Sequence, residues 1–161
     1  MPKSMFKCFI VVFFPLVFLT IISCGSKQPV NLLVNGAFDQ DASSWKPVDC
    51  TLTSVEGGQA GKCLEIRKKG GSAQYALQMM QRLEVGKTYK IAAYVKSGTS
   101  GHEKFVISIG PADATGTSSG QWAAYSVTWK AKEQSASVVL MKDSPTEGTM
   151  LFDSCVLTKS D

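Results

Sequence analysis

The chain has little of what an enzyme active site requires. Its one histidine, His102, lies in a polar stretch, SGTSGHEK, and no serine sits in a Gly-x-Ser-x-Gly pattern. None of its 13 acidic residues forms an evident pair of the kind that glycosidases place about 5–10 Å apart across a cleft. The glycine-containing stretch 116–120 is not followed by Lys-Ser or Lys-Thr, so it does not match a phosphate-binding loop. We therefore expect a protein that is not an enzyme.

A strong excess of charge of one sign is also lacking. The chain carries 17 Lys and Arg against 13 Asp and Glu, and without Lys3 and Lys7 its formal net charge falls from +4 to +2. The one dense basic stretch, 67–69, fits a solvated strand end. Because nucleic-acid-binding domains carry a basic stripe or patch, the sequence argues against a nucleic-acid partner.

Cysteines with the paired spacing of a zinc site are lacking too. Outside the N-terminal segment there are three, Cys50, Cys63 and Cys155, so at least one stays unpaired. Cys50 and Cys63 flank a turn at 57–58, and a simple hairpin would place them nearly opposite each other. We therefore expect a disulfide between them. Cys155 belongs to an apolar alternation and is expected to be a buried free thiol.

The chain begins with a long apolar run. Residues 8–22 follow two lysines and are nearly all apolar, but they are fewer than the roughly 20 residues that cross a bilayer. This organisation favours a secretory signal peptide over a membrane-spanning helix. The run ends in IISC (21–24), which resembles a bacterial lipobox, the motif whose cysteine is diacylated. An ordinary secretory signal with an incidental cysteine is the alternative.

The lipobox resemblance divides the chain into three parts. Residues 1–23 would be a lipoprotein signal peptide, residues 24–30 a lipidated tether, and residues 31–159 one folded domain. Acyl chains on Cys24 would anchor the protein to a membrane of the bacterial cell envelope without spanning it. Gly25 carries no acidic retention signal, and this favours the outer membrane.

After the tether the hydrophobic pattern is typical of β-strands. Short runs of Val, Ile, Leu, Tyr and Trp alternate with polar residues and are interrupted by Gly, Ser, Asp and Asn. The least certain run is 74–84, whose propensity is helical but whose flanking glycines favour a strand. The pattern predicts an all-β fold, a two-sheet β-sandwich of the jelly-roll kind. The expected strands are 31–35, 50–55, 62–68, 74–84, 88–97, 104–109, 122–131, 136–142 and 150–158.

Alternation also assigns side chains to faces. In the run 88–97, Tyr89 belongs to the core face and Tyr94 to the opposite face. In the run 121–131, the core stripe is Tyr125, Val127 and Trp129, whereas Trp122 lies opposite.

The last strand carries an acidic residue among apolar ones. Alternation places Asp153 on one face with Leu151, Cys155 and Leu157. An unpaired buried charge is very costly, so Asp153 needs a partner, and a nearby cation would satisfy it.

Five stretches of the sequence occur in an order that is similar to one known family. They are NLLVNGAFDQDASSW, GKCLEI, LEVGKTYKIAAYVKSG, QWAAYSVTWKA and FDSCVL, and together they span about residues 31–158. In this order they resemble carbohydrate-binding modules of the family 4/9/22 superfamily, galactose-binding-like β-jelly rolls that are often appended to glycoside hydrolases. The resemblance implies the same fold and a non-catalytic, sugar-binding function.

The resemblance also implies a structural calcium ion. The family holds it with an acidic residue after the first motif and an aspartate on the last strand, which match Asp39 and Asp153. Carboxylate oxygens suit Ca²⁺. Two departures weaken the match: Asp39 is shorter than the usual glutamate, and Ser154 stands where a second acidic residue is frequent. Asp39 could instead be an ordinary turn residue.

Sugar binding in such modules relies on aromatic side chains that stack on pyranose rings. The implied candidates are Tyr94, Tyr75, Trp122 and Trp45, with Gln78 as a partner for hydroxyl groups. Tyr94 leads because it lies off the core stripe. Trp45 and Trp122 match positions at which family tryptophans mostly pack structurally, and any of these residues could be ordinary strand residues.

Two functions stay open from the sequence. The first is a surface lipoprotein that captures a polysaccharide or oligosaccharide by aromatic stacking on one sheet face. The second is a structural or adhesive envelope lipoprotein whose jelly roll binds protein and has no glycan site. A separate glycoside hydrolase or another envelope protein could be its partner.

Overall fold

The computed structural model describes residues 29–69 and 74–160. The expected signal peptide, Cys24, most of the tether and the Gly70-Gly71 turn lie outside the described residues. Within the described ranges, no helix is long and apolar enough to cross a membrane.

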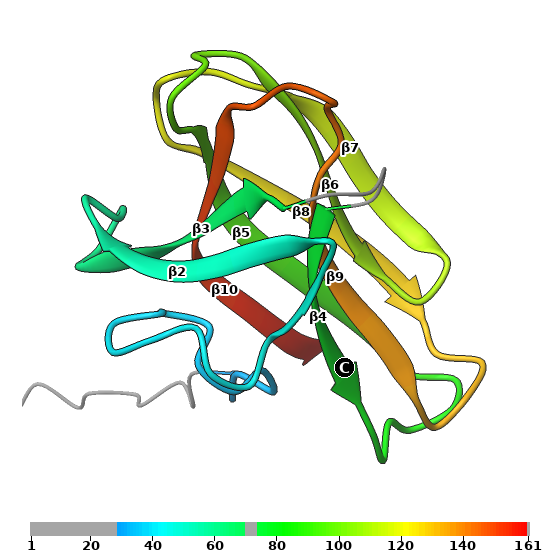
Figure 1. Cartoon of the computed structure of the whole chain (residues 1–161). Helices are drawn as coiled ribbons and strands as arrows, with labels where there is room; N and C mark the ends of the chain where they lie inside the picture. The colour runs from blue at the N-terminus through cyan, green and yellow to red at the C-terminus, as the bar shows by residue number, and fades with distance from the viewer. Residues whose placement is uncertain (1–28, 70–73, 161) are drawn as a thin grey trace, which may run out of the picture.

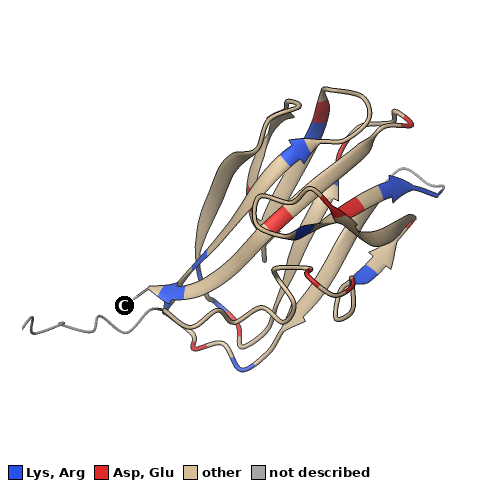
Figure 2. Ribbon diagram, turned by 90° about the vertical axis from the view of Figure 1, so that its left-hand side faces the viewer, with Lys and Arg blue, Asp and Glu red and all other residues tan. Residues whose placement is uncertain are grey.

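Two five-stranded antiparallel sheets pack face to face (Figure 1). In spatial order, sheet A consists of β1 (Lys46–Val48), β4 (Gln74–Met80), β9 (Ala136–Lys142), β6 (Glu103–Ile109) and β7 (Ala112–Ser118). Sheet B consists of β2 (Cys50–Glu56), β3 (Lys62–Lys68), β10 (Thr149–Ser160), β5 (Thr88–Ser97) and β8 (Ala123–Lys130). The predicted all-β sandwich is confirmed. Acidic and basic residues are scattered over its strands and loops (Figure 2).

The strand predictions differ from the structure mainly at the edges of the sheets. Residues 31–35 form no strand, although the Leu32 amide donates to the Leu157 carbonyl at 2.8 Å and so runs beside β10. The edge strands β1 and β7 were not predicted. β1 has three residues including a proline, and β7 is built from small polar residues, so neither carries the apolar alternation that marks a strand.

The core lies between the sheets and follows the predicted alternation in β5 and β8. Tyr89 and Trp129 are buried, and Tyr125 packs against the core with its ring 4.5 Å from that of Phe105. Tyr94 and its neighbours on the same face point away from this core, as predicted.

A β-bulge overturns the face assignment in β10. Asp153 pairs with Tyr94, but the next paired residue is Val156, opposite Ala92. Ser154 is the extra residue of the bulge, and its φ is positive at 49°. Asp153 therefore faces outward, whereas Cys155 lies in the core. The prediction that these two share a face is wrong, because one inserted residue reverses the alternation.

The predicted disulfide is also wrong: Cys50, Cys63 and Cys155 are all free and buried. In the β2–β3 pairing, Cys50 lies opposite Lys68 and Cys63 lies opposite Val55. The two cysteines are thus five pairs apart along the hairpin, about 17 Å at 3.4 Å per residue, and on opposite faces. Burial raises the pKa of the Cys63 thiol to about 11 and also raises that of Cys155, so both are unreactive thiols.

Candidate functional site

An apolar stripe crosses the outer face of sheet A. The strand pairings align Tyr75 of β4 with Met141 of β9 and Val106 of β6, and Val48 of β1 extends the row at the edge. All four side chains are half-buried. Their sequence neighbours Ala76, Leu140 and Ile107 are buried in the core, so alternation points the stripe outward. Leu77 and Val139 form a second, parallel row.

Polar groups border this stripe at one end. Lys104 pairs with Thr117, and the Asp143 amide donates to the Lys104 carbonyl at 2.8 Å. All three residues are exposed, and with Thr115 they line a hollow of about 350 Å³. A flat apolar platform beside exposed hydroxyl, amine and carboxylate groups can hold the apolar face of a polar ring while hydrogen-bonding its substituents.

The aromatic residues Tyr94 and Trp122 lie on the other side of the molecule. Tyr94 belongs to the outer face of sheet B, opposite Asp153, and is half-buried. The Lys96 amine lies 5.6 Å from the centre of the Trp122 ring, at cation–π distance. The structure therefore does not bring Tyr75 and Tyr94 into one site.

Two other predicted contacts are contradicted by burial. The Trp45 ring is 4% exposed, packs on Phe38 at 5.7 Å and donates its indole N–H to the Asn35 carbonyl. The Gln78 amide accepts from the Val34 amide and donates back to the Val34 carbonyl, both at 2.9 Å. Both side chains fasten the N-terminal segment to the sandwich, so neither is available to a glycan.

The two aspartates with predicted metal roles meet the same loop, 58–62. An Asp153 carboxylate oxygen accepts from the Ala60 amide at 2.9 Å, and an Asp39 oxygen accepts from the Lys62 amide at 3.4 Å. Asp153 is fully buried, whereas Asp39 is exposed. Gly58 permits this approach, because a Cβ there would lie 2.8 Å from an Asp153 oxygen.

This arrangement fits a calcium ion in part. Two carboxylates that converge on a loop supply hard oxygen ligands, and Asp153 is a buried charge that accepts hydrogen bonds from the backbone amides of Ala60 and Ser154. In the described ranges, no group of three or more His, Cys, Asp or Glu could hold a metal. Further ligands would therefore have to be carbonyl oxygens of the backbone or of Asn and Gln side chains, or water.

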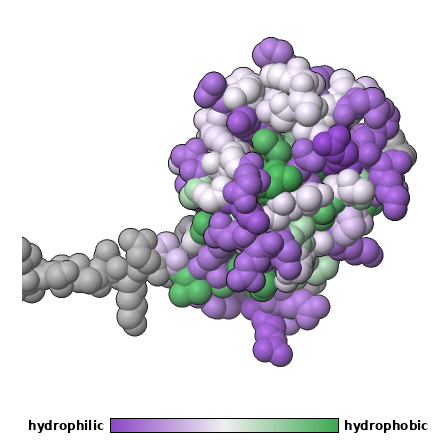
Figure 3. Space-filling model, turned by 60° about the vertical axis from the view of Figure 1, so that its left-hand side comes forward, coloured by the Kyte–Doolittle hydropathy of each residue, from purple (hydrophilic) through white to green (hydrophobic). Residues whose placement is uncertain are grey.

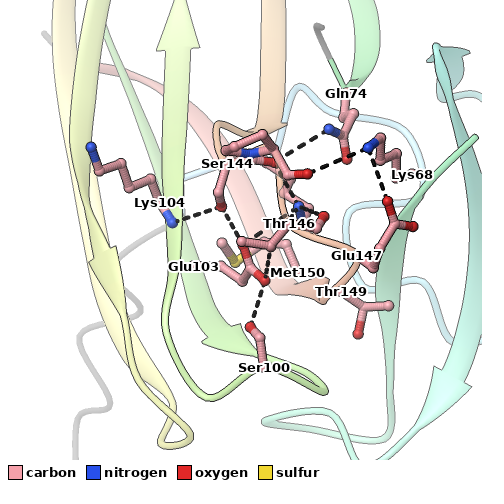
Figure 4. A network of polar contacts seen from close by, with 12 residues as sticks. Lys68, Gln74, Ser100, Glu103, Lys104, Ser144, Thr146, Glu147, Thr149 and Met150 are labelled. Carbon is pink, nitrogen blue, oxygen red and sulfur yellow. Dashed lines mark hydrogen bonds and ion pairs between the residues drawn. The ribbon is translucent and has the colours of Figure 1, made fainter. Parts of the chain in front are cut away.

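A buried polar network, missed by sequence reasoning, supports the polar end of the sheet A face (Figure 4). Glu103 and Lys142 form an ion pair at 3.4 Å with both side chains fully buried. The Lys142 amine donates to the carbonyls of Ser144 and Thr146 at 2.7 Å, and Glu103 accepts from the Ser100 hydroxyl. Lys142 continues the inward alternation of β9, and this was the one available signal.

Burial by itself raises the pKa of Glu103, but its hydrogen bonds and the charge of Lys142 outweigh that effect. The donors are the hydroxyls of Ser100, Ser144 and Thr146, and the net result is a lowered pKa. The network ties the loop 143–148 to the start of β6, so it positions Lys104 and Asp143 at the hollow.

We compared the chain with family models and with curated proteins. The family model for "Carbohydrate binding domain", CBM_4_9, matches residues 30–149. None of the curated proteins compared with the chain matches it.

Solved structures share the fold at low sequence identity. The CBM22-1 xylan-binding domain of Paenibacillus barcinonensis Xyn10C matches with a TM-score of 0.69 and 12% identity over 83% of this chain and 97% of its own. A Clostridium thermocellum xylanase 10B structure, CBM22-1 and GH10 modules complexed with xylohexaose, matches with a TM-score of 0.65 and 19% identity over 83% of this chain. The chain spans only 29% of that xylanase chain. A family 16 carbohydrate-binding module has a TM-score of 0.62 and 19% identity, over 80% of this chain and 99% of its own.

Proposed function

Since the chain belongs to the CBM_4_9 family of carbohydrate-binding domains, we propose that it is a non-catalytic surface lipoprotein that captures a polysaccharide or oligosaccharide. The glycan would lie on the outer face of sheet A, with a sugar ring stacked on Tyr75. Met141 and Val106 would extend the apolar platform, and the residues at the hollow would bind hydroxyl groups.

One observation carries this choice of face. Only on sheet A, among the described residues, does an outward aromatic side chain lie in a row of half-buried apolar neighbours that leads to an exposed polar hollow. On sheet B, Tyr94 sits beside the buried Asp153, and the Lys96 amine lies near the Trp122 ring. The solved relatives were seen with xylohexaose or β-1,4-galactotriose, so neutral β-linked chains are the first ligands to try.

The anchor and the metal belong to the same proposal. Cys24 would be diacylated and would hold the domain at a bacterial envelope membrane, with the outer membrane favoured. Asp39 and Asp153 would hold a structural Ca²⁺ ion that fixes the loop 58–62 against β10. A glycoside hydrolase or another envelope protein would act on the captured glycan.

The test is glycan binding by the purified protein, followed by matched tyrosine variants. We expect an array of plant, algal, microbial and host glycans to show one polymer class whose binding is competed by its free oligosaccharide. Tyr75→Ala should weaken that binding about 5- to 150-fold, since burying an aromatic face contributes roughly 1–3 kcal/mol. Tyr94→Ala is the control on the opposite sheet and should leave binding unchanged.

Other outcomes would redirect the proposal. Loss of binding in Tyr94→Ala but not in Tyr75→Ala would move the site to sheet B. Silence of the folded protein across the array would favour the structural or adhesive lipoprotein instead.

A further inference from the structure

One end of the sandwich combines the start of the described chain with two loops. β4 ends at Met80 and β5 begins at Thr88, while β8 ends at Lys130 and β9 begins at Ala136. The loops between them, 81–87 and 131–135, are joined by backbone hydrogen bonds such as that from the Gly86 amide to the Ala131 carbonyl at 2.8 Å. The C-terminus of β10 lies at the same end, near the bottom of Figure 1. We call this the tether end.

The start of the described chain is held at the tether end. Pro29, Val30 and Leu32 line a hollow of about 420 Å³ together with Met80, Leu83 and Tyr89. The bond from the Leu32 amide to the Leu157 carbonyl fixes the chain there. The first described residue, Pro29, therefore lies at the tether end.

Apolar side chains are exposed around this point. Val30 is 76% exposed and Val85 in the loop 81–87 is 59% exposed, and Leu32 is also exposed. Figure 3 shows apolar surface next to the point where the described chain begins. Exposed apolar residues that gather at one place mark an interaction surface more often than scattered ones do.

The tether end is also basic. Its described loops and strand ends carry three acidic residues, Glu84, Glu133 and Asp113 at the start of β7, and the Lys159 amine pairs with Glu84 at 2.7 Å. The cations at this end, all of them exposed, are Arg82, Lys87, Lys130, Lys132 and Lys159. Basic side chains near apolar ones suit a surface that presents anionic headgroups above a hydrocarbon layer.

Chain length sets how far this end can lie from a lipid anchor. Five residue steps separate Cys24 from Pro29, and a fully extended chain covers about 3.3–3.6 Å per residue, or about 18 Å in total. If Cys24 carries acyl chains, as the proposed function has it, the tether end must stay within that distance of the bilayer, whereas the opposite end is free to lie farther away.

We propose that the tether end is a membrane-contact surface. Val30, Leu32 and Val85 touch the lipid interface, and the basic residues face anionic lipid headgroups. The strands then stand away from the membrane, and the outer face of sheet A opens sideways with its polar hollow at the far end. This rests on the lipid anchor of the proposed function, but its own content is the orientation of the domain.

The test is lysine acetylation of the full lipidated protein in vesicles, read by mass spectrometry. In vesicles of phosphatidylglycerol and phosphatidylcholine, the acetylation rates of Lys87, Lys130 and Lys132 should fall about threefold or more relative to detergent, because the headgroups cover them. Lys69 and Lys104, exposed near the opposite end, are internal controls and should react equally in both.

Flotation of the same sample tests the lipid anchor separately from the orientation of the domain. Protein that does not float with vesicles refutes the anchor. Protein that floats but shows equal acetylation at both ends, or protection at Lys69 and Lys104, overturns the orientation alone.

A charge variant tests the basic component. Replacing Lys130 and Lys132 by glutamate should restore the reactivity of Lys87 toward its detergent value, whereas replacing Lys69 and Lys104 should not. Protection of Lys87 that is the same in vesicles of pure phosphatidylcholine would overturn the role of anionic headgroups.

Discussion

The buried ion pair between Glu103 and Lys142 yields the sharpest prediction about stability. Lys142→Met removes an amine that donates two 2.7 Å hydrogen bonds and faces a carboxylate at 3.4 Å, with both side chains fully buried. It leaves Glu103 as a buried charge without its cation. Breaking such a pair costs about 3–5 kcal/mol, so we expect a loss of that size in the free energy of unfolding.

Urea unfolding followed by tryptophan fluorescence would measure this loss. The matched control is Lys62→Met, because the Lys62–Glu56 pair lies at 3.5 Å on the surface and should contribute less than about 1 kcal/mol. A second variant, Lys142→Met with Glu103→Leu, removes both charges and should recover most of the loss. The reasoning is refuted if Lys142→Met costs no more than the surface control, or if the double variant is no more stable than the single one.

The pH dependence gives an independent check. Glu103 has a pKa below its ordinary value of 4.5, so its contribution to stability is present above that value and is lost as the pH falls through the lowered pKa. Without Lys142 the pKa of Glu103 should rise, because the charge of Lys142 no longer helps the hydroxyl hydrogen bonds to offset burial. The stability difference between wild type and Lys142→Met should therefore shrink as the pH falls from about 7 to about 4.

Three further predictions follow from the cysteines, the aspartate loop and the tryptophans. Cys50 and Cys63 should both be alkylated in the unfolded protein without reductant, as read by mass spectrometry, and a crosslinked peptide would contradict the strand register. Calcium should raise the melting temperature of the wild type but not of Asp153→Asn, and equal shifts would refute the metal site. Trp45→Ala should lower the free energy of unfolding by about 3–5 kcal/mol, whereas Trp122→Ala should lower it less because Trp122 is only half-buried. Urea unfolding of both variants would measure the difference.

Local patterns in the sequence carried much of the fold. Alternation of apolar and polar residues depends only on the geometry of a strand, so β5 and β8 and their core residues could be predicted one strand at a time. The bulge at Ser154 could not be predicted, because a serine in the sequence does not indicate a positive φ. The disulfide prediction was wrong for a related reason. The turn at 57–58 suggested that Cys50 and Cys63 lie opposite each other, but only the strand register shows that they are far apart.

The candidate site depended far more on tertiary structure. Alternation shows that Tyr75 and Tyr94 both point outward, but it cannot tell that they lie on opposite sheets, because sheet membership is set by pairings between distant strands. Gln78 resembled an exposed glutamine until the N-terminal segment folded over it. The partners Glu103 and Lys142 are far apart in the chain, and only the packed sandwich brings them together.

The sequence by itself thus determined the β-sandwich, its core stripes and the likeness to carbohydrate-binding modules, because these follow from local periodicity and short motifs. The tertiary structure decided which outward side chains share a face, which polar groups are buried by packing and at which end of the sandwich the described chain begins. Those features are contacts between residues that are distant in sequence. They form only when the two sheets pack against each other, so no local pattern predicts them.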